Sequence, residues 1–312
     1  MQPITIDFNP ITLADQAMFK QYLGGRRHNL CTFNFTNFFL WKKWDPTGWA
    51  NVEGAICMKS SFHGLDNVLM PFAPTDEPIL RAVEVLQQWY KGRGVPFILT
   101  EVSASMKQLL EEQFPGRFVA EEYRPGFNYV YLQSDLATLP GRKYAQKRNH
   151  VSRFIRECPD YQFVPLTREL IPGCLECMDV WKAARDTENA ELLKEEEGAR
   201  DGLLHFAELG VTGACLIVGG KVQAFTFGEA LNNDTFVIHV EKGNIAIPGI
   251  FQAINHFFAR DYCSGYTYIN REEDMGDPGQ RKAKGSYHPC HLEEKYYLYL
   301  TEEYNSICEL RR

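Results

Sequence analysis

The chain has 312 residues and carries 33 Lys and Arg against 40 Asp and Glu, a formal net charge of −7 at pH 7. This acidic balance argues against a protein that coats nucleic acid, although it leaves room for a local basic site. Hydrophobic residues make up 45% of the sequence and aromatic residues 13%, which is enough for packed cores rather than disorder. The length suits about two domains of ordinary size.

The cysteines and the first residues bear on the compartment. Nine cysteines are scattered along the chain, and Cys174 and Cys177 form the one CxxC pair. We interpret them as small buried residues in a reducing compartment, with a zinc or redox role for the pair as the lesser alternative. The beginning, MQPITIDFNPITLADQ, lacks the pattern of a signal peptide, and no stretch approaches the roughly 18 apolar residues of a membrane helix. We expect a soluble, cytoplasmic protein without a transmembrane segment or a bound metal.

The first half of the chain predicts helices alternating with strands. Residues 12–23 have helical periodicity, and residues 33–44 place an aromatic residue at nearly every turn of a helix. We interpret the second segment as a core helix, with a hydrophobic ligand groove as the alternative. Asp76 is expected to cap a helix that Gly92 and Gly94 end. The remaining expected elements are strands at 51–60, 67–72, 97–100, 118–119 and 127–132 and a helix at 105–114.

A comparable series of elements follows Tyr161. Gly219 and Gly220 lie between two strand-like segments, which predicts a hairpin. The expected elements of this half are strands at 163–166, 213–218, 222–231, 235–240, 266–269 and 292–300 and helices at 172–185, 195–209 and 250–260.

The two halves are alike in order and in how they end. Each closes on a tyrosine-rich strand, PGFNYVYL in the first and EKYYLYL in the second. This predicts a duplicated unit of the α/β (α+β) class with mixed central sheets. The expected division is a domain at 1–140, a basic linker helix at 141–160, and a domain at 161–312 that carries the active site.

The linker contains the most concentrated positive charge in the sequence, GRKYAQKRNHVSRFIR. If it is helical from Lys143, then Lys143, Lys147 and His150 share one face. Acidic residues are absent until Glu157, so few salt bridges between successive turns can balance the charge. A solvated helix is the common alternative, but unbalanced charge favours an anion, such as the phosphates of a cofactor, a lipid head group or RNA.

A second informative segment runs from Tyr266 to Pro289. It begins as a short strand and continues into acids, a Gly-Asp-Pro-Gly turn and then bases. Polar groups at the end of a strand are where α/β proteins place ligand chemistry. A solvated charged loop is the alternative. The mixture of side-chain types favours a site, and the candidates are Glu272, Glu273, Asp274, Arg281, Lys284, Tyr287 and His288.

Three segments together resemble one family: RKYAQKRNHVSRF, EKGN…GIFQAIN and INREEDMGDPGQRKAKGSYHP. The family is the soluble C-terminal catalytic domain of bacterial phosphatidylglycerol lysyltransferases and its stand-alone relatives. The resemblance implies a tandem fold of the acyl-CoA N-acyltransferase (GNAT-like) type. It also implies transfer of an aminoacyl group from aminoacyl-tRNA to an acceptor, here a small molecule or a lipid head group.

The resemblance also assigns positions. The family's acidic stretch before a glycine corresponds to Glu272, Glu273, Asp274 and Gly276. Its basic residues correspond to Arg281 and Lys284 after that stretch and to Lys143, Lys147, Arg148 and Arg153 in the linker.

One position bears on the choice of donor. Acyl-CoA members of the fold resemble one another in a glycine-rich phosphate turn before the helix that here begins near Gly249. This chain has GNIAIPG there, and Pro248 has no N–H to offer a pyrophosphate. Gly249 is still a candidate phosphate-binding position, at the start of a helix.

Acyl transfer needs a proton acceptor, a partner for the oxyanion and a proton donor for the leaving group. The three acids at 272–274 are expected to hold an ammonium group and take the proton, without a choice among them. Arg281 and Lys284 are expected to bind phosphate or developing negative charge. Tyr287 or His288 is expected to protonate the leaving group. No covalent nucleophile or resident cofactor is needed, because the donor is already activated.

Three functions remain open on this sequence. The first is an acyltransferase or aminoacyltransferase with an aminoacyl-tRNA donor. The second is an N-acyltransferase with acyl-CoA as its donor substrate. The third is a binding module that keeps the fold without the chemistry.

Overall fold

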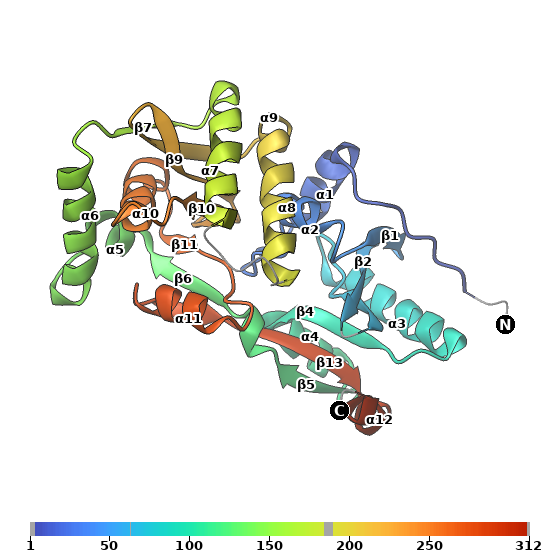
Figure 1. Ribbon diagram of the computed structural model, residues 1–312. Helices are drawn as coiled ribbons and strands as arrows, with labels where there is room; N and C mark the ends of the chain where they lie inside the picture. Colours follow the sequence, from blue (N-terminus) through green and yellow to red (C-terminus); the bar gives the residue numbers. More distant parts are fainter. Residues whose placement is uncertain (1–3, 63, 184–189, 311–312) are drawn as a thin grey trace. The chain divides into compact units, whose positions relative to one another are not determined.

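The computed structural model describes residues 4–62, 64–183 and 190–310, and the chain forms two units, each built around a β-sheet (Figure 1). The first unit comprises Met1–Phe127 with Glu293–Arg312, and the second comprises Asn128–Leu292. Both sheets contain parallel and antiparallel neighbours. The predicted α/β class with mixed central sheets is therefore confirmed. Within the described ranges, no helix is both long enough and apolar enough to cross a membrane.

The sheet of the first unit has six strands in the order β1-β2-β3-β4-β13-β5. The strands are β1 (Gly48–Val52), β2 (Ala55–Phe62), β3 (Leu65–Leu69), β4 (Ile98–Ser103), β5 (Phe118–Glu122) and β13 (Lys295–Leu300). The first three form an antiparallel meander, and β4 is parallel to β3. A tight turn at Glu53 and Gly54, both with positive φ, divides the segment 51–60 that the sequence suggested was one strand. Strand β3 begins at Leu65, two residues before the start of the expected strand at 67–72.

Helix α3 provides the crossover between the two parallel strands of this unit. It spans Asp76–Arg93, with Thr75 as its N-cap and Gly94 in the left-handed conformation at its end. Asp76 is therefore the first helical residue rather than the cap, and its charge favours the N-terminal end of the helix dipole. The other helices of the unit are α1 (Gln16–Leu23), α2 (Phe35–Trp41), α4 (Ala104–Gln113) and α12 (Tyr304–Leu310). The aromatic helix α2 is buried, with Phe38 stacked on Phe72 at 5.6 Å between ring centroids, as expected of a core helix.

The sheet of the second unit has seven strands in the order β12-β6-β11-β10-β9-β8-β7. The strands are β6 (Asn128–Leu132), β7 (Gln162–Pro165), β8 (Thr212–Val218), β9 (Lys221–Ala230), β10 (Thr235–Gly243), β11 (Tyr268–Asn270) and β12 (His291–Glu293). Strands β7 to β10 are successively antiparallel, and β11 is parallel to β10. The hairpin between β8 and β9 turns at Gly219 and Gly220, both with positive φ, as predicted.

Helices cover both faces of this second sheet. They are α5 (Gln133–Thr138), α6 (Ala145–Glu157), α7 (Ile171–Ala183), α8 (Ala190–Leu204), α9 (Phe206–Leu209), α10 (Ile250–Tyr262) and α11 (Pro278–Gly285). Cys215 on β8 lies 3.5 Å from Cys174 of α7, whereas its neighbours Ala214 and Leu216 join the core around α10. Since successive side chains of a strand point to opposite faces, α7 and α10 cover opposite sides of the sheet. The expected end of α7 at Arg185 lies outside the described residues.

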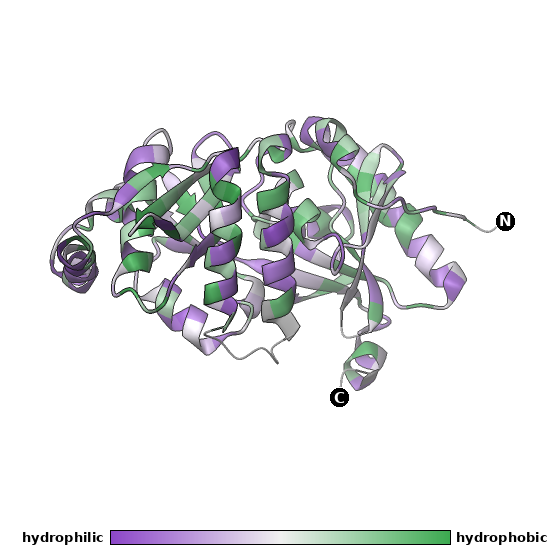
Figure 2. Cartoon of the chain, turned by 45° about the horizontal axis from the view of Figure 1, so that its top comes forward, coloured by the Kyte–Doolittle hydropathy of each residue, from purple (hydrophilic) through white to green (hydrophobic). Residues whose placement is uncertain are grey.

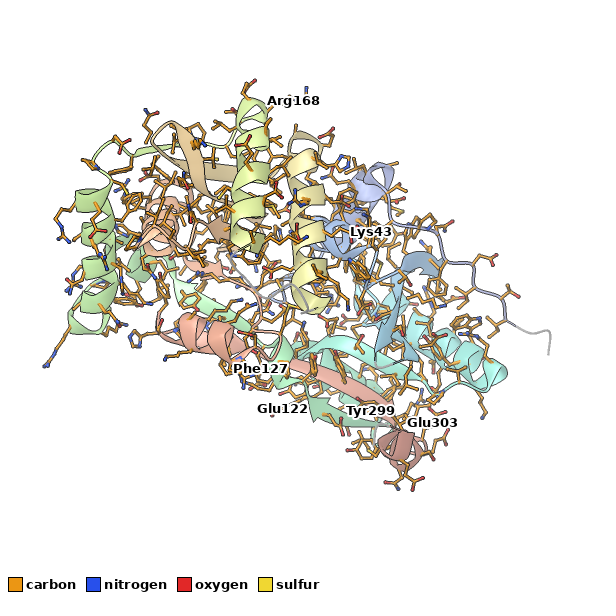
Figure 3. The ribbon with its side chains drawn as sticks, in the orientation of Figure 1. Lys43, Glu122, Phe127, Arg168, Tyr299 and Glu303 are labelled. Atoms are coloured by element: carbon orange, nitrogen blue, oxygen red, sulfur yellow. The ribbon has the colours of Figure 1, made fainter. Side chains whose placement is uncertain are left out.

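The two tyrosine-rich strands that suggested a repeat are exchanged between the units. Strand β6, from the first half of the sequence, lies between β11 and β12, and β13, from the second half, lies between β4 and β5. In the first unit, Tyr297 and Tyr299 of β13 join a small core with Ile98 (Figure 3). The order strand, helix, parallel strand, helix, edge strand occurs in both units, so the topology supports a duplication. Because of this exchange, the two units do not coincide with the expected division at 1–140, 141–160 and 161–312.

Helix α6, which the sequence suggested was a linker, packs within the second unit. It is strongly hydrophilic on its outer side (Figure 2), yet Val151 and Phe154 are buried in the core around α10. Helix α6 contacts the start of helix α10 at Gly249, the N-cap of α10, which has φ +81°. A Cβ placed on Gly249 would lie 2.2 Å from the carbonyl oxygen of His150. Only glycine fits here, both for its backbone conformation and for its contact with α6.

We predict that Gly249→Ala destabilises the second unit. The left-handed backbone alone costs roughly 1–2 kcal/mol for a residue with a Cβ, and the backbone oxygen of His150 adds to that cost. The control is Gly265→Ala, because Gly265 has an ordinary φ and no atom within 4 Å of an added Cβ. Urea unfolding of both variants measures the difference. Equal stability of the two variants would show that α6 does not press against Gly249.

Candidate functional site

The polar residues of the second unit gather where β11 ends and with it the parallel pairing of β11 with β10, which stops at Val237 and Asn270. Strand β11 stops at Asn270, whose buried side chain receives a hydrogen bond from the Glu272 backbone N–H at 2.8 Å. Glu272 itself has φ +56°. The chain therefore turns sharply at the carboxyl end of the strand, which is the usual position for a ligand site in an α/β sheet. A positive φ on a residue other than glycine or asparagine is uncommon and occurs often at functional positions.

The turn expected at residues 276–279 is the start of helix α11. The Asp277 side chain accepts a hydrogen bond from the Gln280 N–H at 2.6 Å, and Pro278 occupies the first helical position. Aspartate at the N-cap followed by proline is a known helix-start signal. The surrounding glycines obscured this signal in the sequence.

Asp274 holds this segment together rather than facing a substrate. Its carboxylate is fully buried and accepts hydrogen bonds from the Tyr129 hydroxyl (2.7 Å), from two nitrogens of Arg281 (2.9 and 3.0 Å) and from the Gly276 N–H (2.9 Å). Burial alone would raise the pKa of Asp274, but these donors outweigh burial and lower the pKa to about 2. A carboxylate this acidic is a poor base at neutral pH. The pairing also means that Arg281 already has an anionic partner within the unit.

Glu272 lies in a buried group that we call the His239 triad, comprising Glu229, His239 and Glu272. His239 Nδ1 lies 2.9 Å from Glu272 Oε1, and His239 Nε2 lies 3.4 Å from Glu229 Oε1. Strand β10 carries one extra residue opposite β9 at this point, and such a bulge re-aims the side chain. The His239 side chain is 0% exposed, and that of Glu272 is 19% exposed.

The charges of the triad are set by competition between burial and pairing. Burial alone lowers the pKa of His239, but the two carboxylates outweigh it and raise the pKa to about 9. Burial, with help from Glu273, raises the pKa of Glu272, against the opposing effect of His239. At pH 7 the triad therefore places a protonated imidazole beside a buried carboxylate whose pKa is also raised. Pairs of this kind are typical of acid–base sites.

Arg271 forms a second buried group, which we call the Arg271 cluster, with Glu241, Asn255, Tyr131 and Tyr287. Arg271 Nη2 donates to Glu241 Oε1 at 2.9 Å, and Asn255 Nδ2 donates to Glu241 Oε2 at 2.9 Å. The guanidinium lies 4.9 Å from the Tyr287 ring centroid. Arg271 Nη1 is buried and lacks a hydrogen-bond acceptor among the described residues. One charge-bearing donor of the cluster is therefore unused.

Two lysines complete the polar region. Lys147 of α6 is buried, donates to Ser286 Oγ at 2.6 Å and lies 3.9 Å from the Tyr287 ring centroid. Burial and the nearby Arg271 lower the pKa of Lys147 to about 8. Lys284 Nζ donates to the carbonyl oxygens of Arg271 and Glu273, and burial lowers its pKa. Helix α6 therefore meets the 270–289 segment directly, at Lys147.

The other linker bases have local partners. Arg148 donates to the carbonyl oxygens of Leu139 and Gly141, just after helix α5. Lys143 pairs with Asp135 at 3.1 Å, and Arg153 pairs with Glu157 at 2.8 Å. Arg148 therefore stabilises the chain between α5 and α6, whereas the long side chains of Lys143 and Arg153 are half exposed and remain open to an exchange of partners.

The remaining predicted positions fall close to these groups. Glu273 accepts a hydrogen bond from Asn128 Nδ2 at 3.1 Å. Burial raises the pKa of Tyr287, so its hydroxyl keeps its proton. His288 is exposed, with its Nε2 3.3 Å from the Lys143 carbonyl oxygen. At Gly249, the carbonyl oxygen of His150 covers the start of α10, which is unfavourable for a phosphate.

Sequence reasoning missed most of the buried groups. His239, Glu229, Glu241, Arg271 and Asn255 were not among the predicted site residues. A signal was available, because His239, Glu241 and Lys242 interrupt a strand, TFVIHVEKG, that begins with an apolar run. Charged side chains inside a central strand are rarely buried without partners.

We predict that Asp274→Asn lowers the free energy of unfolding at pH 7 by roughly 1–3 kcal/mol, because charge-assisted hydrogen bonds are lost. Since the folded pKa is lowered, this contribution is present above about pH 4 and disappears as the pH falls towards 2. Denaturant unfolding at pH 7, 4 and 3 measures the loss. Asp261→Asn, which breaks an exposed pair with Arg260, is the control and should change stability by less than about 1 kcal/mol. If the stability lost in Asp274→Asn is the same at all three pH values, the lowered pKa of Asp274 is contradicted.

Comparison with known proteins gives a family and a fold. The family model described as phosphatidylglycerol lysyltransferase, C-terminal, matches residues 26–299. A comparison with curated proteins finds no match. Among solved structures, a conserved protein of unknown function from Bacteroides thetaiotaomicron VPI-5482 is 35% identical, covering 95% of this chain and 100% of that chain with a TM-score of 0.87.

Two more distant structures show the same fold. L-PGS from Bacillus licheniformis is 16% identical, covers 94% of this chain and 93% of that chain, and has a TM-score of 0.66. FemX is 11% identical, covers 95% of this chain and 98% of that chain, and has a TM-score of 0.60. The predicted tandem GNAT-like fold is confirmed. Together with the family model that matches residues 26–299, it supports an acyltransferase-type superfamily. The match over residues 26–299 shows that the chain belongs to the phosphatidylglycerol lysyltransferase C-terminal family, as the sequence resemblance predicted.

Proposed function

We propose that the protein transfers an aminoacyl group from aminoacyl-tRNA to an amine or hydroxyl acceptor, with the His239 triad as its acid–base group. The observation that carries the proposal is the triad itself. It combines a carboxylate of raised pKa, a paired imidazole and a partly exposed edge at the carboxyl ends of two parallel strands. The family name adds support, because it denotes transfer of a lysyl group to phosphatidylglycerol.

The proposed step requires one proton acceptor. The acceptor's nitrogen or oxygen attacks the ester carbonyl carbon of the donor and loses its proton to Glu272. The carbon–oxygen bond to the tRNA ribose then breaks, and the ribose oxygen takes that proton back from Glu272. His239 keeps Glu272 oriented through the 2.9 Å contact and balances its charge in each state. Arg271, with an unused buried N–H donor, is the candidate partner for the negative charge on the carbonyl oxygen.

Among the three neighbouring acids, this proposal selects Glu272. Asp274 is held by four donors at a pKa of about 2, so it stays ionised and bound to Arg281. Glu273 accepts a hydrogen bond from the Asn128 amide at 3.1 Å. Glu272 instead contacts His239, whose pKa is raised to about 9, and burial raises the pKa of Glu272 itself.

The proposed contact for the tRNA is the outer side of helix α6. Arg153 and Arg156 are 51% and 72% exposed, and they share the single carboxylate of Glu157 at 2.8 and 3.7 Å. Two guanidinium groups against one carboxylate leave a net positive charge that phosphates can neutralise. The carbonyl oxygen of His150 at the start of α10 argues against the acyl-CoA alternative, which would use that helix end for pyrophosphate.

We predict that Glu272→Gln lowers kcat/KM for aminoacyl transfer by about 10²–10⁴-fold, the range for loss of a general base. The assay measures the transfer of labelled lysine from lysyl-tRNA to phosphatidylglycerol vesicles in one arm and to a soluble primary amine in the other. The two arms distinguish a lipid acceptor from a small one. Glu273→Gln is the matched control and should change the rate by less than about tenfold. Equal losses in the two variants would contradict the choice of Glu272.

We also predict that tRNA binding depends on salt through α6. Replacing Arg153 and Arg156 with alanine should reduce the slope of log K against log salt concentration by roughly 1.5, since each neutralised phosphate contributes about 0.7–0.9. Replacing Arg81 and Lys91 of α3 removes the same formal charge from the first unit and is the control. Filter binding of aminoacyl-tRNA at several salt concentrations measures the slope. If both double variants have the same slope, α6 is not the contact.

A further inference from the structure

The first unit contains a cavity of about 230 Å³ that the proposed transfer does not use. It opens where the parallel strands β3 and β4 end, because Met70 follows β3 and Ser103 ends β4. Its lining residues belong to the first unit, and one of them, Glu293, is also the last residue of β12. This is the same topological position that the His239 triad and the Arg271 cluster occupy in the second unit, where the parallel pairing of β10 and β11 ends.

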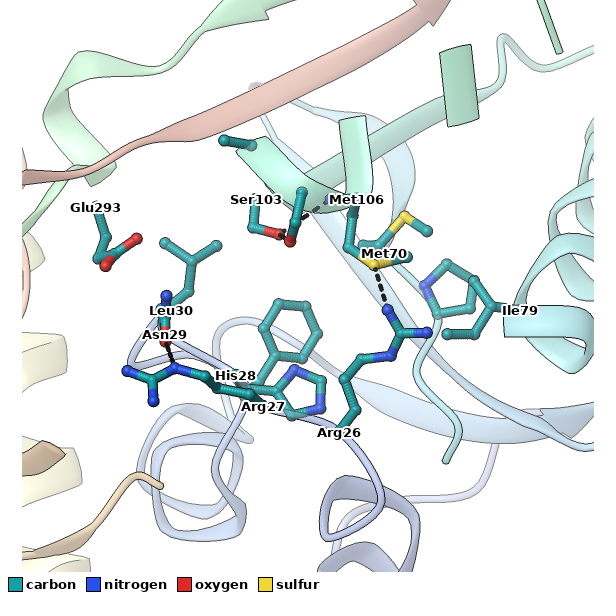
Figure 4. A pocket seen from close by; sticks show the side chains of 14 residues that line it. Arg26, Arg27, His28, Asn29, Leu30, Met70, Ile79, Ser103, Met106 and Glu293 are labelled. Atoms are coloured by element: carbon teal, nitrogen blue, oxygen red, sulfur yellow. Dashed lines mark hydrogen bonds between the residues drawn. The ribbon is translucent and has the colours of Figure 1, made fainter. Parts of the chain in front are cut away.

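One wall of the cavity is basic and comes from the segment between α1 and α2. Arg26, Arg27 and His28 reach the cavity from this side, opposite Ser103 and Met106 (Figure 4). The ionisable side chains of the lining are these three and Glu293. Burial, followed by the charge of Arg26, lowers the pKa of His28 to about 4, so His28 is neutral at pH 7. The lining therefore contains two permanent positive charges and one negative charge.

Arg26 has hydrogen-bonding capacity that the protein leaves unused. Its Nη2 pairs with Asp76, and its Nη1 donates to the sulfur of Met106 at 3.2 Å. A thioether sulfur is a weak acceptor. The Nε of Arg26 is buried and has no hydrogen-bond partner in the part of the chain that the structure describes. A buried guanidinium nitrogen without an acceptor is costly unless a bound group supplies one.

The opposite wall is the beginning of helix α4, which spans ten residues. The Ser103 side chain caps it by accepting from the Met106 N–H at 3.3 Å. The positive end of the helix dipole thus faces the same space as the two arginines. Apolar side chains complete the lining, among them Leu30, Phe33 and Ile79. Phe33 also stacks on His28, with 5.0 Å between ring centroids, and this contact holds the imidazole at the basic wall.

We propose that this cavity binds a small organic anion, a carboxylate or a phosphate that carries a short apolar chain. The anionic group lies against Arg26, Arg27 and the start of α4, and the apolar chain lies against Leu30, Phe33 and Ile79. The volume of about 230 Å³ limits the ligand to a small molecule. The proposal is independent of the transfer reaction, because every residue that carries it belongs to the first unit.

Isothermal titration of the full chain with four probes tests the proposal. The probes are hexanoate, butyl phosphate, inorganic phosphate and the neutral hexanamide. At least one organic anion should bind about tenfold or more tightly than both hexanamide and inorganic phosphate. Only an organic anion has both a charge for the arginines and an apolar chain for the apolar part of the lining. The comparison of hexanoate with butyl phosphate decides between the two anionic groups. Equal binding of hexanamide, or no saturable binding by either organic anion, would overturn the proposal.

Variants and a spectroscopic signal locate the binding. Arg27→Gln should lower the affinity for the organic anion by about tenfold. Ala104→Met should place a larger side chain in the cavity from the α4 side and prevent binding. Arg117→Gln, which alters another cavity of the same unit, is the matched control and should bind as the unchanged chain does. An anion beside His28 should raise the pKa of His28 above about 4 in an NMR titration of the histidine ring protons. Binding that is unchanged in both cavity variants would place the ligand elsewhere and contradict the proposal.

Discussion

The compensation of buried charge where the parallel pairing of β10 and β11 ends is the constraint on which the second unit depends. Isolated charges cannot be held away from water at this depth, so each must have a partner. Arg271 has Glu241, His239 has two carboxylates, and Asp274 has Arg281. These pairs fix the segment after β11 against β10 and α10. The bulge at His239 and the positive φ at Glu272 persist because the surrounding pairs hold them in place.

Local rules explain why much of the fold could be predicted from sequence. Helix α3 ends at Gly94, and the β8–β9 hairpin turns at two glycines, because these conformations depend on residues within one turn of each other. The apolar residues of helix α10 recur at helical spacing in the sequence, and this spacing identifies the buried face. The strand after Asn51 was harder to divide, because its turn uses Glu53, a residue that seldom adopts positive φ.

The site resisted prediction because its contacts are distant in sequence. Tyr129 and Asp274 form a hydrogen bond across 145 positions, and His239 meets Glu272 across 33. The sequence identified the acids at 272–274 and Lys147 as polar residues but could not show their partners. It therefore assigned one role to three acids, whereas the structure gives each acid different neighbours. Arg281 and Arg148 look like phosphate ligands in sequence, but their guanidinium groups already bind a carboxylate and two carbonyl oxygens.

Strand exchange gives the duplication a physical consequence. Each unit takes a central strand from the opposite half of the sequence, so neither half can complete its sheet without the other. The repeated topology can then diverge in its sites while the framework stays the same. Where its parallel pairing ends, the second unit has buried charged side chains that pair with one another. The first unit has kept a cavity there, with an arginine whose buried nitrogen has no acceptor among the described residues. The same topological position is thus a compensated polar centre in one unit and a basic cavity in the other.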